Sequence, residues 1–363
     1  MRHCVVLFLA YFNPPRRYKF QHLDLQIFPR SPDIQDLIVL VFSLFSTKMS
    51  TPNLDALKRD GFVVVRNLIT PTEVSHYREI ATKATTLTRS GSWPHFRTVP
   101  KQFPPWPTTA PPASEGGIWG VQHLMHPEMP GRESFARCYF SPTILAVAEE
   151  LMGVENGASS ETELLVMELF NLLVAPETKD FELRWHRDDI SEHATAEEEI
   201  AQLASKAPGG RQSHCQYNLA LCPDASLIVV PGTHARARTQ VEREADPYAA
   251  ELPDQLVVQL QPGDAVFYNS NILHRGVYRG KSEGGVEMRL TLHGSLGLKA
   301  SGRGGDDVEE KKKVRATAVL QHGVGAWVHR EDAAFGLGER AERMRANLVE
   351  MGTGEGVGFS LQG

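Results

Sequence analysis

Short segments in which apolar and polar residues alternate dominate the second half of the chain. Strict alternation places every second side chain on the same face of a β-strand, and these segments are rich in β-branched and aromatic residues. Turn sequences such as Pro231-Gly232 and Pro262-Gly263-Asp264 separate them. Short strands at this spacing favour an all-β sandwich or barrel, jelly roll included. The expected strands lie within residues 181–188, 215–222, 226–232, 255–269 and 285–297.

Helical patterns flank this strand-rich region. Thr70 is a favourable N-cap, Pro71 occupies the first helical position, and Glu73 completes a capping box. Ser141 and Gly153 similarly mark the start and the end of a second helix. We also expect an acidic helix inserted between strands and a C-terminal amphipathic helix packed on the sheet. The five helical segments are 53–61, 70–87, 141–153, 192–206 and 339–352.

Three further segments have less regular patterns. Residues 163–174 are mostly apolar, and their period does not separate strand from helix. Residues 93–119 contain seven prolines and three tryptophans, which excludes a regular helix or a central strand and suits either a substrate-covering lid or a surface loop packing its own rings. Residues 300–313 are highly charged and are expected to form a solvated loop.

Composition limits the partners of the protein. The chain has 363 residues, 41% of them hydrophobic and 23% charged, which is ordinary for a globular protein. Its net charge of −6 argues against nucleic acid or an anionic membrane as the main partner. The four cysteines include no C-x-x-C pair and do not make a disulfide framework. We therefore expect a reducing, cytoplasmic setting.

The first 48 residues differ from the rest. Two apolar runs of about ten residues are too short to span a bilayer as helices, and no small-residue cleavage site follows the first run. A new pattern begins at Met49. We expect residues 1–48 to be a poorly ordered extension, with a membrane anchor as the alternative, and residues 49–363 to form a single domain.

The candidate chemistry begins at His186. On a strand, His186 and Asp188 point to the same side, whereas Asp189 points to the other. An imidazole and a carboxylate on one face supply two ligands to a single ion, although the same triplet is also compatible with a polar strand end. His274 follows a Pro-Gly-Asp turn and an apolar strand, and we expect it at the end of a β-hairpin. Two histidines and one carboxylate on a β scaffold are the ligand set of non-haem Fe(II) oxygenases.

Arg289 adds a possible anion site. Arg289, Thr291 and His293 share one face of the next strand, and Met288, Leu290 and Leu292 share the other. A buried guanidinium needs an anionic partner, and arginine can hold a carboxylate through two parallel hydrogen bonds. The partner is either the distal carboxylate of a dicarboxylic co-substrate or a structural Asp or Glu.

These segments resemble a known family. "RWHRDD", "NLALCPDASLIVVPGTH", "PGDAVFYNSNILHRG" and "MRLTLHGS" occur in the order found in the phytanoyl-CoA dioxygenase family, and the likeness, over roughly residues 55–350, is closest to its fungal branch. The resemblance implies a double-stranded β-helix (jelly-roll, cupin-like) core with flanking helices. It also implies that His186, Asp188 and His274 bind Fe(II) and that Arg289 binds 2-oxoglutarate, with dioxygen as the oxidant.

The resemblance implies hydroxylation or desaturation of an apolar small molecule, such as a lipid or secondary metabolite, with release of succinate and CO2. The shorter loop before Pro231 and the absence of a peroxisomal signal argue against phytanoyl-CoA itself. A zinc-bound or non-catalytic cupin-like protein is the alternative; a halogenase generally lacks the carboxylate ligand. Arg275 and Arg279 are rival arginines, and Asn171 resembles a cavity-lining position. Of five further histidines, His214 and His234 are expected as polar loop residues, and His193 at the edge of the acidic helix rather than as a ligand. His123 and His126 are expected to have hydrogen-bonded structural roles, with lining of the cavity as the alternative.

Overall fold

The structure is a computed structural model that describes residues 51–102, 106–154, 164–206, 212, 214–280, 289–299 and 306–352. The expected N-terminal extension lies outside these residues. Within them, no helix is long and apolar enough to cross a membrane.

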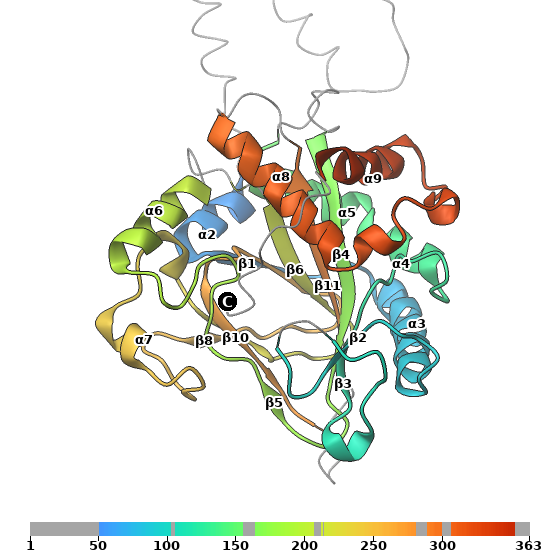
Figure 1. The fold of residues 1–363 in the computed structure, drawn as a ribbon, viewed down its shortest axis with the longest axis horizontal. Helices are drawn as coiled ribbons and strands as arrows, with labels where there is room; N and C mark the ends of the chain where they lie inside the picture. Colours follow the sequence, from blue (N-terminus) through green and yellow to red (C-terminus); the bar gives the residue numbers. More distant parts are fainter. Residues whose placement is uncertain are drawn as a thin grey trace, which may run out of the picture. The chain divides into compact units, whose positions relative to one another are not determined.

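Two antiparallel sheets form the centre of the fold (Figure 1). The larger sheet has seven strands in the order β1-β9-β6-β11-β4-β3-β2, and the smaller has four in the order β5-β10-β7-β8. From β4 to β7 and again from β8 to β11, consecutive strands alternate between the two sheets, as in a jelly roll. The larger sheet comprises β1 (Phe62–Val65), β2 (Phe96–Thr98), β3 (Ile118–Val121), β4 (Leu165–Val174), β6 (His214–Ala220), β9 (Ala265–Tyr268) and β11 (Leu290–Leu298). The smaller comprises β5 (Phe181–Glu182), β7 (Leu227–Val230), β8 (Leu256–Val257) and β10 (Leu273–Tyr278).

The two faces of the larger sheet have different chemistry. One row of register partners, Leu172, Leu292 and Leu219, runs across β4, β11 and β6 and is fully buried in the main hydrophobic core. The next row on the same strands consists of Asn171, His293 and Asn218. Because successive residues point to opposite faces, one face is apolar and the other, which lines the inside of the roll, is polar. The expected split of Thr291 and His293 from Leu290 and Leu292 is confirmed.

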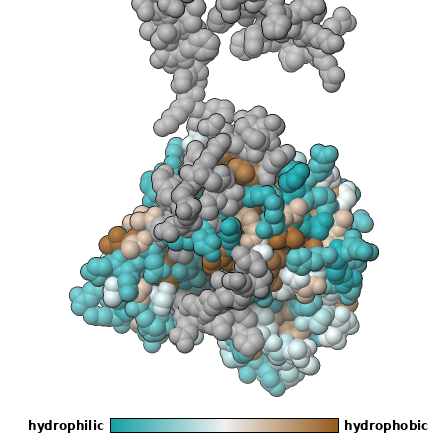
Figure 2. All heavy atoms as spheres, turned by 45° about the horizontal axis from the view of Figure 1, so that its top comes forward, coloured by the Kyte–Doolittle hydropathy of each residue, from teal (hydrophilic) through white to brown (hydrophobic). Residues whose placement is uncertain are grey.

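Helices cover the apolar face. In Figure 1, α3, α4 and α9 gather on one side of the long strand β4, and α9 packs against β4 as expected. The buried side chains of these helices belong to the same hydrophobic core as Leu172, Leu219 and Leu292. On the face shown in Figure 2, most of the described surface is hydrophilic. The helices are α2 (Pro52–Asp60), α3 (Pro71–Arg89), α4 (Arg132–Tyr139), α5 (Pro142–Met152), α6 (Ala196–Lys206), α7 (Gln240–Glu244), α8 (Asp306–Gln321) and α9 (Glu339–Met351).

Local sequence signals fix the helix ends. The Thr70 hydroxyl accepts a hydrogen bond from the Glu73 backbone N–H, and the Glu73 carboxylate accepts one from the Thr70 N–H. Ser141 caps α5 in the expected way. Gly61 ends α2 at φ 83°, where a side chain would also collide with the His234 ring, since an added Cβ would lie 2.4 Å from Nδ1. These three predictions are confirmed.

Several expectations about secondary structure were wrong or incomplete. The strand expected over 181–188 is regular only in β5, because the Trp185 N–H leaves the ladder and donates to the Pro247 carbonyl. The loop expected over 300–313 is helical from Asp306, within α8. The proline-rich segment 93–119 contains the edge strand β2 and the start of β3, with most of its prolines between them. The expectation that it holds no central strand was wrong, because β3 pairs with both β2 and β4. The ambiguous segment 163–174 forms strand β4.

Candidate metal centre

A single antiparallel bridge brings two histidines together. The His186 N–H donates to the His274 carbonyl and the His274 N–H donates to the His186 carbonyl, each at 3.0 Å. The two ring centroids lie 4.4 Å apart. His274 is the second residue of β10, which belongs to the smaller sheet while the preceding β9 belongs to the larger. The connection is therefore a crossing between sheets rather than the expected hairpin.

Backbone carbonyls fix the orientation of both imidazoles. Nδ1 of His186 lies 2.7 Å from the Arg184 carbonyl oxygen, and Nδ1 of His274 lies 2.9 Å from that of Ile272. A carbonyl only accepts, so each Nδ1 carries the hydrogen and each Nε2 keeps its lone pair. Both rings thus leave Nε2 available to bind a metal ion.

Asp188 completes the group. Its backbone N–H donates to the Ser270 carbonyl at 2.9 Å, which places the carboxylate beside the imidazoles. Oδ1 lies 3.4 Å from Nε2 of His186 and 3.7 Å from Nε2 of His274. Oδ2 accepts a 2.7 Å hydrogen bond from the Gln216 amide of β6. The smaller sheet and its loop supply the three side chains, and the larger sheet orients the carboxylate.

The separations fit a shared metal ion. All three candidate ligand atoms lie within 4.8 Å of one another. Ligands about 2 Å from one ion and adjacent around it are separated by roughly 3–3.5 Å. The imidazoles are 5% and 7% exposed but the carboxylate is 32% exposed, so the group is open on the carboxylate side. An open position distinguishes catalytic from purely structural metal sites.

Electrostatics favour the ligating forms. Burial and the neighbouring His186 lower the pKa of His274 to about 4, so its imidazole is neutral near pH 7. Burial alone would raise the pKa of Asp188, but the two imidazoles and the Gln216 hydrogen bond hold it well below its ordinary value. A neutral imidazole and an ionised carboxylate are the forms that bind a cation.

A family comparison agrees with this geometry. The model of the phytanoyl-CoA dioxygenase family matches residues 57–277, which is more than half of the chain and includes His186, Asp188 and His274. The chain belongs to this family. It is therefore an enzyme of the 2-oxoglutarate-dependent, non-haem iron dioxygenase type, with iron and 2-oxoglutarate as its cofactors.

Solved structures similar to this member of the family are distant in sequence. The non-haem α-ketoglutarate-dependent epimerase SnoN from nogalamycin biosynthesis is 18% identical, with 68% of this chain and 81% of that chain covered and a TM-score of 0.41. EctD from S. alaskensis, crystallised with 2-oxoglutarate and 5-hydroxyectoine, is 16% identical, with coverage of 69% and 76% and a TM-score of 0.46. A comparison with curated proteins found no match.

Arg289 lies beyond the family match and is held by an acid. Its Nε donates to Oδ2 of Asp224 at 3.1 Å, and its guanidinium carbon lies 4.5 Å from the Tyr278 ring centroid. Burial would lower the pKa of Arg289, but Asp224 and Tyr278 raise it. Nη1 is buried and has no hydrogen-bond partner among the described residues. Asp224 therefore occupies one edge of the guanidinium and leaves a donor unpaired.

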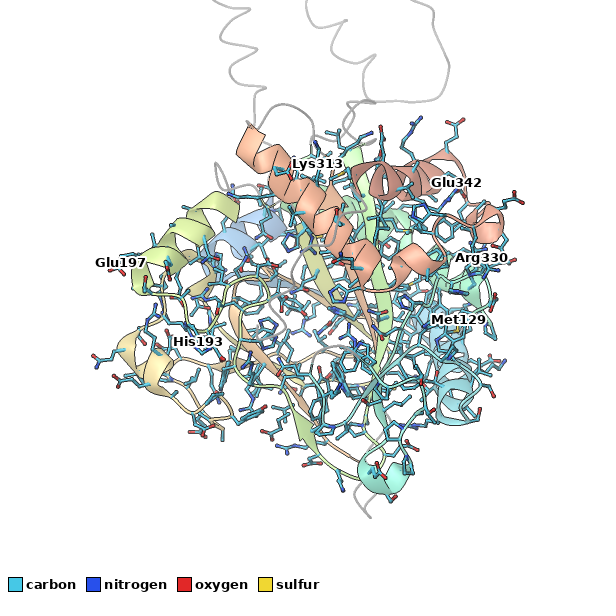
Figure 3. All side chains as sticks on the ribbon, viewed as in Figure 1. Met129, His193, Glu197, Lys313, Arg330 and Glu342 are labelled. Carbon is cyan, nitrogen blue, oxygen red and sulfur yellow. The ribbon has the colours of Figure 1, made fainter. Side chains whose placement is uncertain are left out.

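The other candidate residues of this family member have partners outside the group of three candidate ligands. Asp189 accepts hydrogen bonds from Ser270 and Asn271. Arg275 pairs with Glu182 and stacks over Trp185, and Arg279 is exposed beside Asp180, so both rival arginines are engaged outside the centre. The side chain of His193, in the loop before α6, is 74% exposed (Figure 3).

The remaining predicted positions have structural partners. The Asn171 carboxamide oxygen accepts from the His123 N–H, within the polar face as expected. The Nδ1 atom of His126 accepts from the Glu128 N–H, and Nε2 of His234 lies 3.2 Å from the Lys58 carbonyl. His214 was expected in a loop, but it is the buried first residue of β6, and its Nε2 lies 2.7 Å from the Ser270 hydroxyl.

Sequence reasoning missed three residues at the site. Gln216 orients Asp188, Asp224 holds Arg289, and Arg97 of β2 lies on the same face of the sheet as Thr291. Period-two alternation in "CQYNLALC" places Gln216 and Asn218 on one face, and this signal could have identified Gln216. No local pattern connects Asp224 or Arg97 with its neighbours.

Proposed function

We propose that this dioxygenase hydroxylates, or desaturates, an apolar small molecule and releases succinate and CO2. The observation that carries the proposal is the convergence of His186, Asp188 and His274, with each Nδ1 bonded to a carbonyl and each Nε2 close to Oδ1 of Asp188. That arrangement supplies three protein ligands on one side of an ion and leaves the other side open for small molecules.

The side chains divide the task between binding and orientation. His186, Asp188 and His274 would hold the iron, and Gln216 would keep Oδ1 of the aspartate directed toward it. When bound, ferrous iron with 2-oxoglutarate and dioxygen supplies the oxidation of an unactivated C–H bond. Arg289 would donate from its unpaired Nη1 to the distal carboxylate of 2-oxoglutarate, while Asp224 fixes the orientation of the guanidinium.

A cluster of buried aromatic side chains supports the proposal that the substrate is apolar. Trp119, Phe181 and Tyr278 pack with ring centroids 5.3–6.1 Å apart. Leu173, which shares the inner face of the sheet with Asn171, belongs to the same cluster. Trp119 comes from the proline-rich segment, so this segment would contribute a wall that excludes water from an apolar substrate.

Metal and co-substrate binding test the proposal without knowledge of the substrate. Anaerobic addition of Fe(II) and 2-oxoglutarate should produce a weak visible charge-transfer band in the native protein. His186→Ala and Asp188→Ala should lose the band and also the succinate formed under air, because each variant lacks one of three ligands. His193→Ala is the matched control, since this exposed histidine follows Asp188 closely in the sequence but is not part of the group. A band of native intensity in either ligand variant would contradict the assignment. A native protein that retains Zn(II) and gives no band would be a cupin-like binding protein instead.

A further inference from the structure

Arg97 lies on the inner face of the larger sheet. Register partners connect Arg97 with Gly120, Gly120 with Leu173, and Leu173 with Thr291 across β2, β3, β4 and β11. The adjacent row begins at Phe96 and continues through Val121 into the hydrophobic core on the opposite face. Arg97 therefore projects toward the same interior as Thr291.

Gly120 provides the space for the Arg97 side chain. A Cβ on Gly120 would lie 3.2 Å from Cδ of Arg97 and 3.4 Å from its Cβ, which is tighter than ordinary side-chain contacts. Because glycine has no side chain, the arginine stem can lie across β3, and its guanidinium carbon lies 5.1 Å from the Trp119 ring centroid. This contact fixes the direction of the guanidinium.

No acidic residue of the described chain forms an ion pair with Arg97. Its Nε is buried without an acceptor, and no hydrogen bond from its terminal nitrogens is formed with these residues. Burial lowers the pKa of Arg97, while Tyr278, Tyr268 and Asp188 act in the opposite direction, so all three are electrostatic neighbours of the guanidinium. A guanidinium that is partly removed from water and has no anion is costly, so an external anion at this position would be stabilised.

Two arginines flank one aromatic pair. The Trp119 and Tyr278 ring centroids are 5.3 Å apart, with Arg97 over Trp119 and Arg289 over Tyr278. Arg289 has Asp224 as a partial partner, whereas Arg97 has no acidic partner among the residues that the structure describes. Arg289 and Arg97 therefore offer two separate cationic positions beside the same aromatic pair.

We propose that Arg97 binds a carboxylate of the substrate, which would make the substrate an apolar acid rather than a wholly apolar compound. The inference rests on the proposed function, in which Arg289 takes the distal carboxylate of 2-oxoglutarate. The arginine fork suits a carboxylate, and the adjoining cluster of Trp119, Phe181 and Tyr278 suits the apolar body of the same molecule. Arg97 would then be a positioning residue that fixes which carbon faces the metal centre.

The test compares acids with their methyl esters. A panel of apolar carboxylic acids and the matching esters is added to protein loaded with Mn(II) and 2-oxoglutarate, and the melting temperature is recorded. The acids should raise the melting temperature, and the esters should not. Arg97→Met preserves the packing over Gly120 and Trp119 but should weaken binding of the acids about 10–100-fold, the range for a charge-assisted hydrogen bond. Arg97→Lys should recover only part of the affinity. Arg279→Met, at an arginine with a 60% exposed side chain, is the matched control.

The outcomes separate this inference from the proposed function. If esters bind as well as acids, if no acid binds, or if Arg97→Met binds acids normally, the inference is overturned. If Arg97→Met instead weakens the binding of 2-oxoglutarate tenfold or more in equilibrium dialysis, Arg97 binds the co-substrate rather than the substrate. That result also overturns the inference. Failure of the proposed function would look different, because the native protein would then give no charge-transfer band with Fe(II) and 2-oxoglutarate.

Discussion

Gln216 donates a 2.7 Å hydrogen bond from its side-chain amide to Oδ2 of Asp188. The donor comes from β6 of the larger sheet, whereas the acceptor follows the short strand β5 of the smaller sheet. The bond joins the larger sheet to the loop after β5 at the candidate metal centre, and it leaves the other carboxylate oxygen facing the two imidazoles. Residues that orient ligands in this way tune metal affinity although they do not touch the metal.

Gln216→Leu should weaken metal binding without abolishing the fold. The leucine is similar in size but cannot donate, so Asp188 would lose one of the contacts that fix its rotamer. Loss of such an orienting contact typically costs about 10–100-fold in metal affinity. Competition between the protein and a Mn(II) indicator measures this directly. Gln240→Leu, on the exposed surface of α7, is the control. Equal Mn(II) affinity in Gln216→Leu and the native protein would show that the hydrogen bond does not orient the ligand.

Arg289→Ala should raise the dissociation constant for 2-oxoglutarate about 10–100-fold and leave the affinity for Mn(II) unchanged. The reason is that the buried Nη1 is the donor assigned to the distal carboxylate. Asp224→Asn should raise the dissociation constant for 2-oxoglutarate by a smaller factor. The Arg289 guanidinium keeps its charge in this variant but loses the carboxylate that orients it. Equilibrium dialysis with Mn(II)-loaded protein measures both constants. An unchanged constant in Arg289→Ala would move the anchor to another residue, with Arg97 the first to examine.

The sequence predicted those features that depend on neighbours along the chain. Helix caps at Thr70 and Ser141 need only a few consecutive residues, and the H-x-D spacing places His186 and Asp188 on one side. Features that depend on strand register could not be predicted from the sequence. The contact between Gln216 and Asp188 is an example, because it depends on how β6 lies against the loop after β5. Arg97 was missed for the same reason, because its position on the inner face depends on the strand pairings through Gly120 and Leu173.

The misassigned loop at 300–313 has a related physical cause. Its described charged residues Glu310, Lys311 and Lys313 are exposed, as expected, but the segment is helical from Asp306. Arg315, further along α8, forms two hydrogen bonds of 2.7 Å with the Glu168 carboxylate of β4. Although burial would lower the pKa of Arg315, Glu168 raises it. A contact between residues so far apart in sequence attaches the helix to the sheet, and no local pattern encodes it.

Arg315→Met should lower the free energy of unfolding by about 3 kcal/mol, because the Glu168 side chain, 2% exposed, would be left as a buried charge without a partner. The double variant Glu168→Gln/Arg315→Met should recover part of that loss, since the buried charge is then absent. Urea denaturation of the native protein, the single variants Arg315→Met and Glu168→Gln, and the double variant gives the coupling energy. Arg330→Met, at a surface ion pair, should change stability much less. A loss within about 0.5 kcal/mol for Arg315→Met, the range of ordinary surface changes, would contradict the role given to this pair.

His123 should make stability depend on pH. Burial and the neighbouring His95 lower its pKa in the folded protein to about 3 from an ordinary value of 6.5. As the pH falls below 6.5, the unfolded chain binds a proton that the folded protein does not bind until about pH 3. Unfolding therefore becomes easier, by about 1.4 kcal/mol per pH unit for this residue. His123→Asn removes the group and tolerates the backbone φ of 61°, so its unfolding free energy in urea should fall less steeply between pH 6 and about pH 4. If the unfolding free energy of the metal-free variant and that of the metal-free native protein fall equally with pH, His123 is already protonated in the folded state.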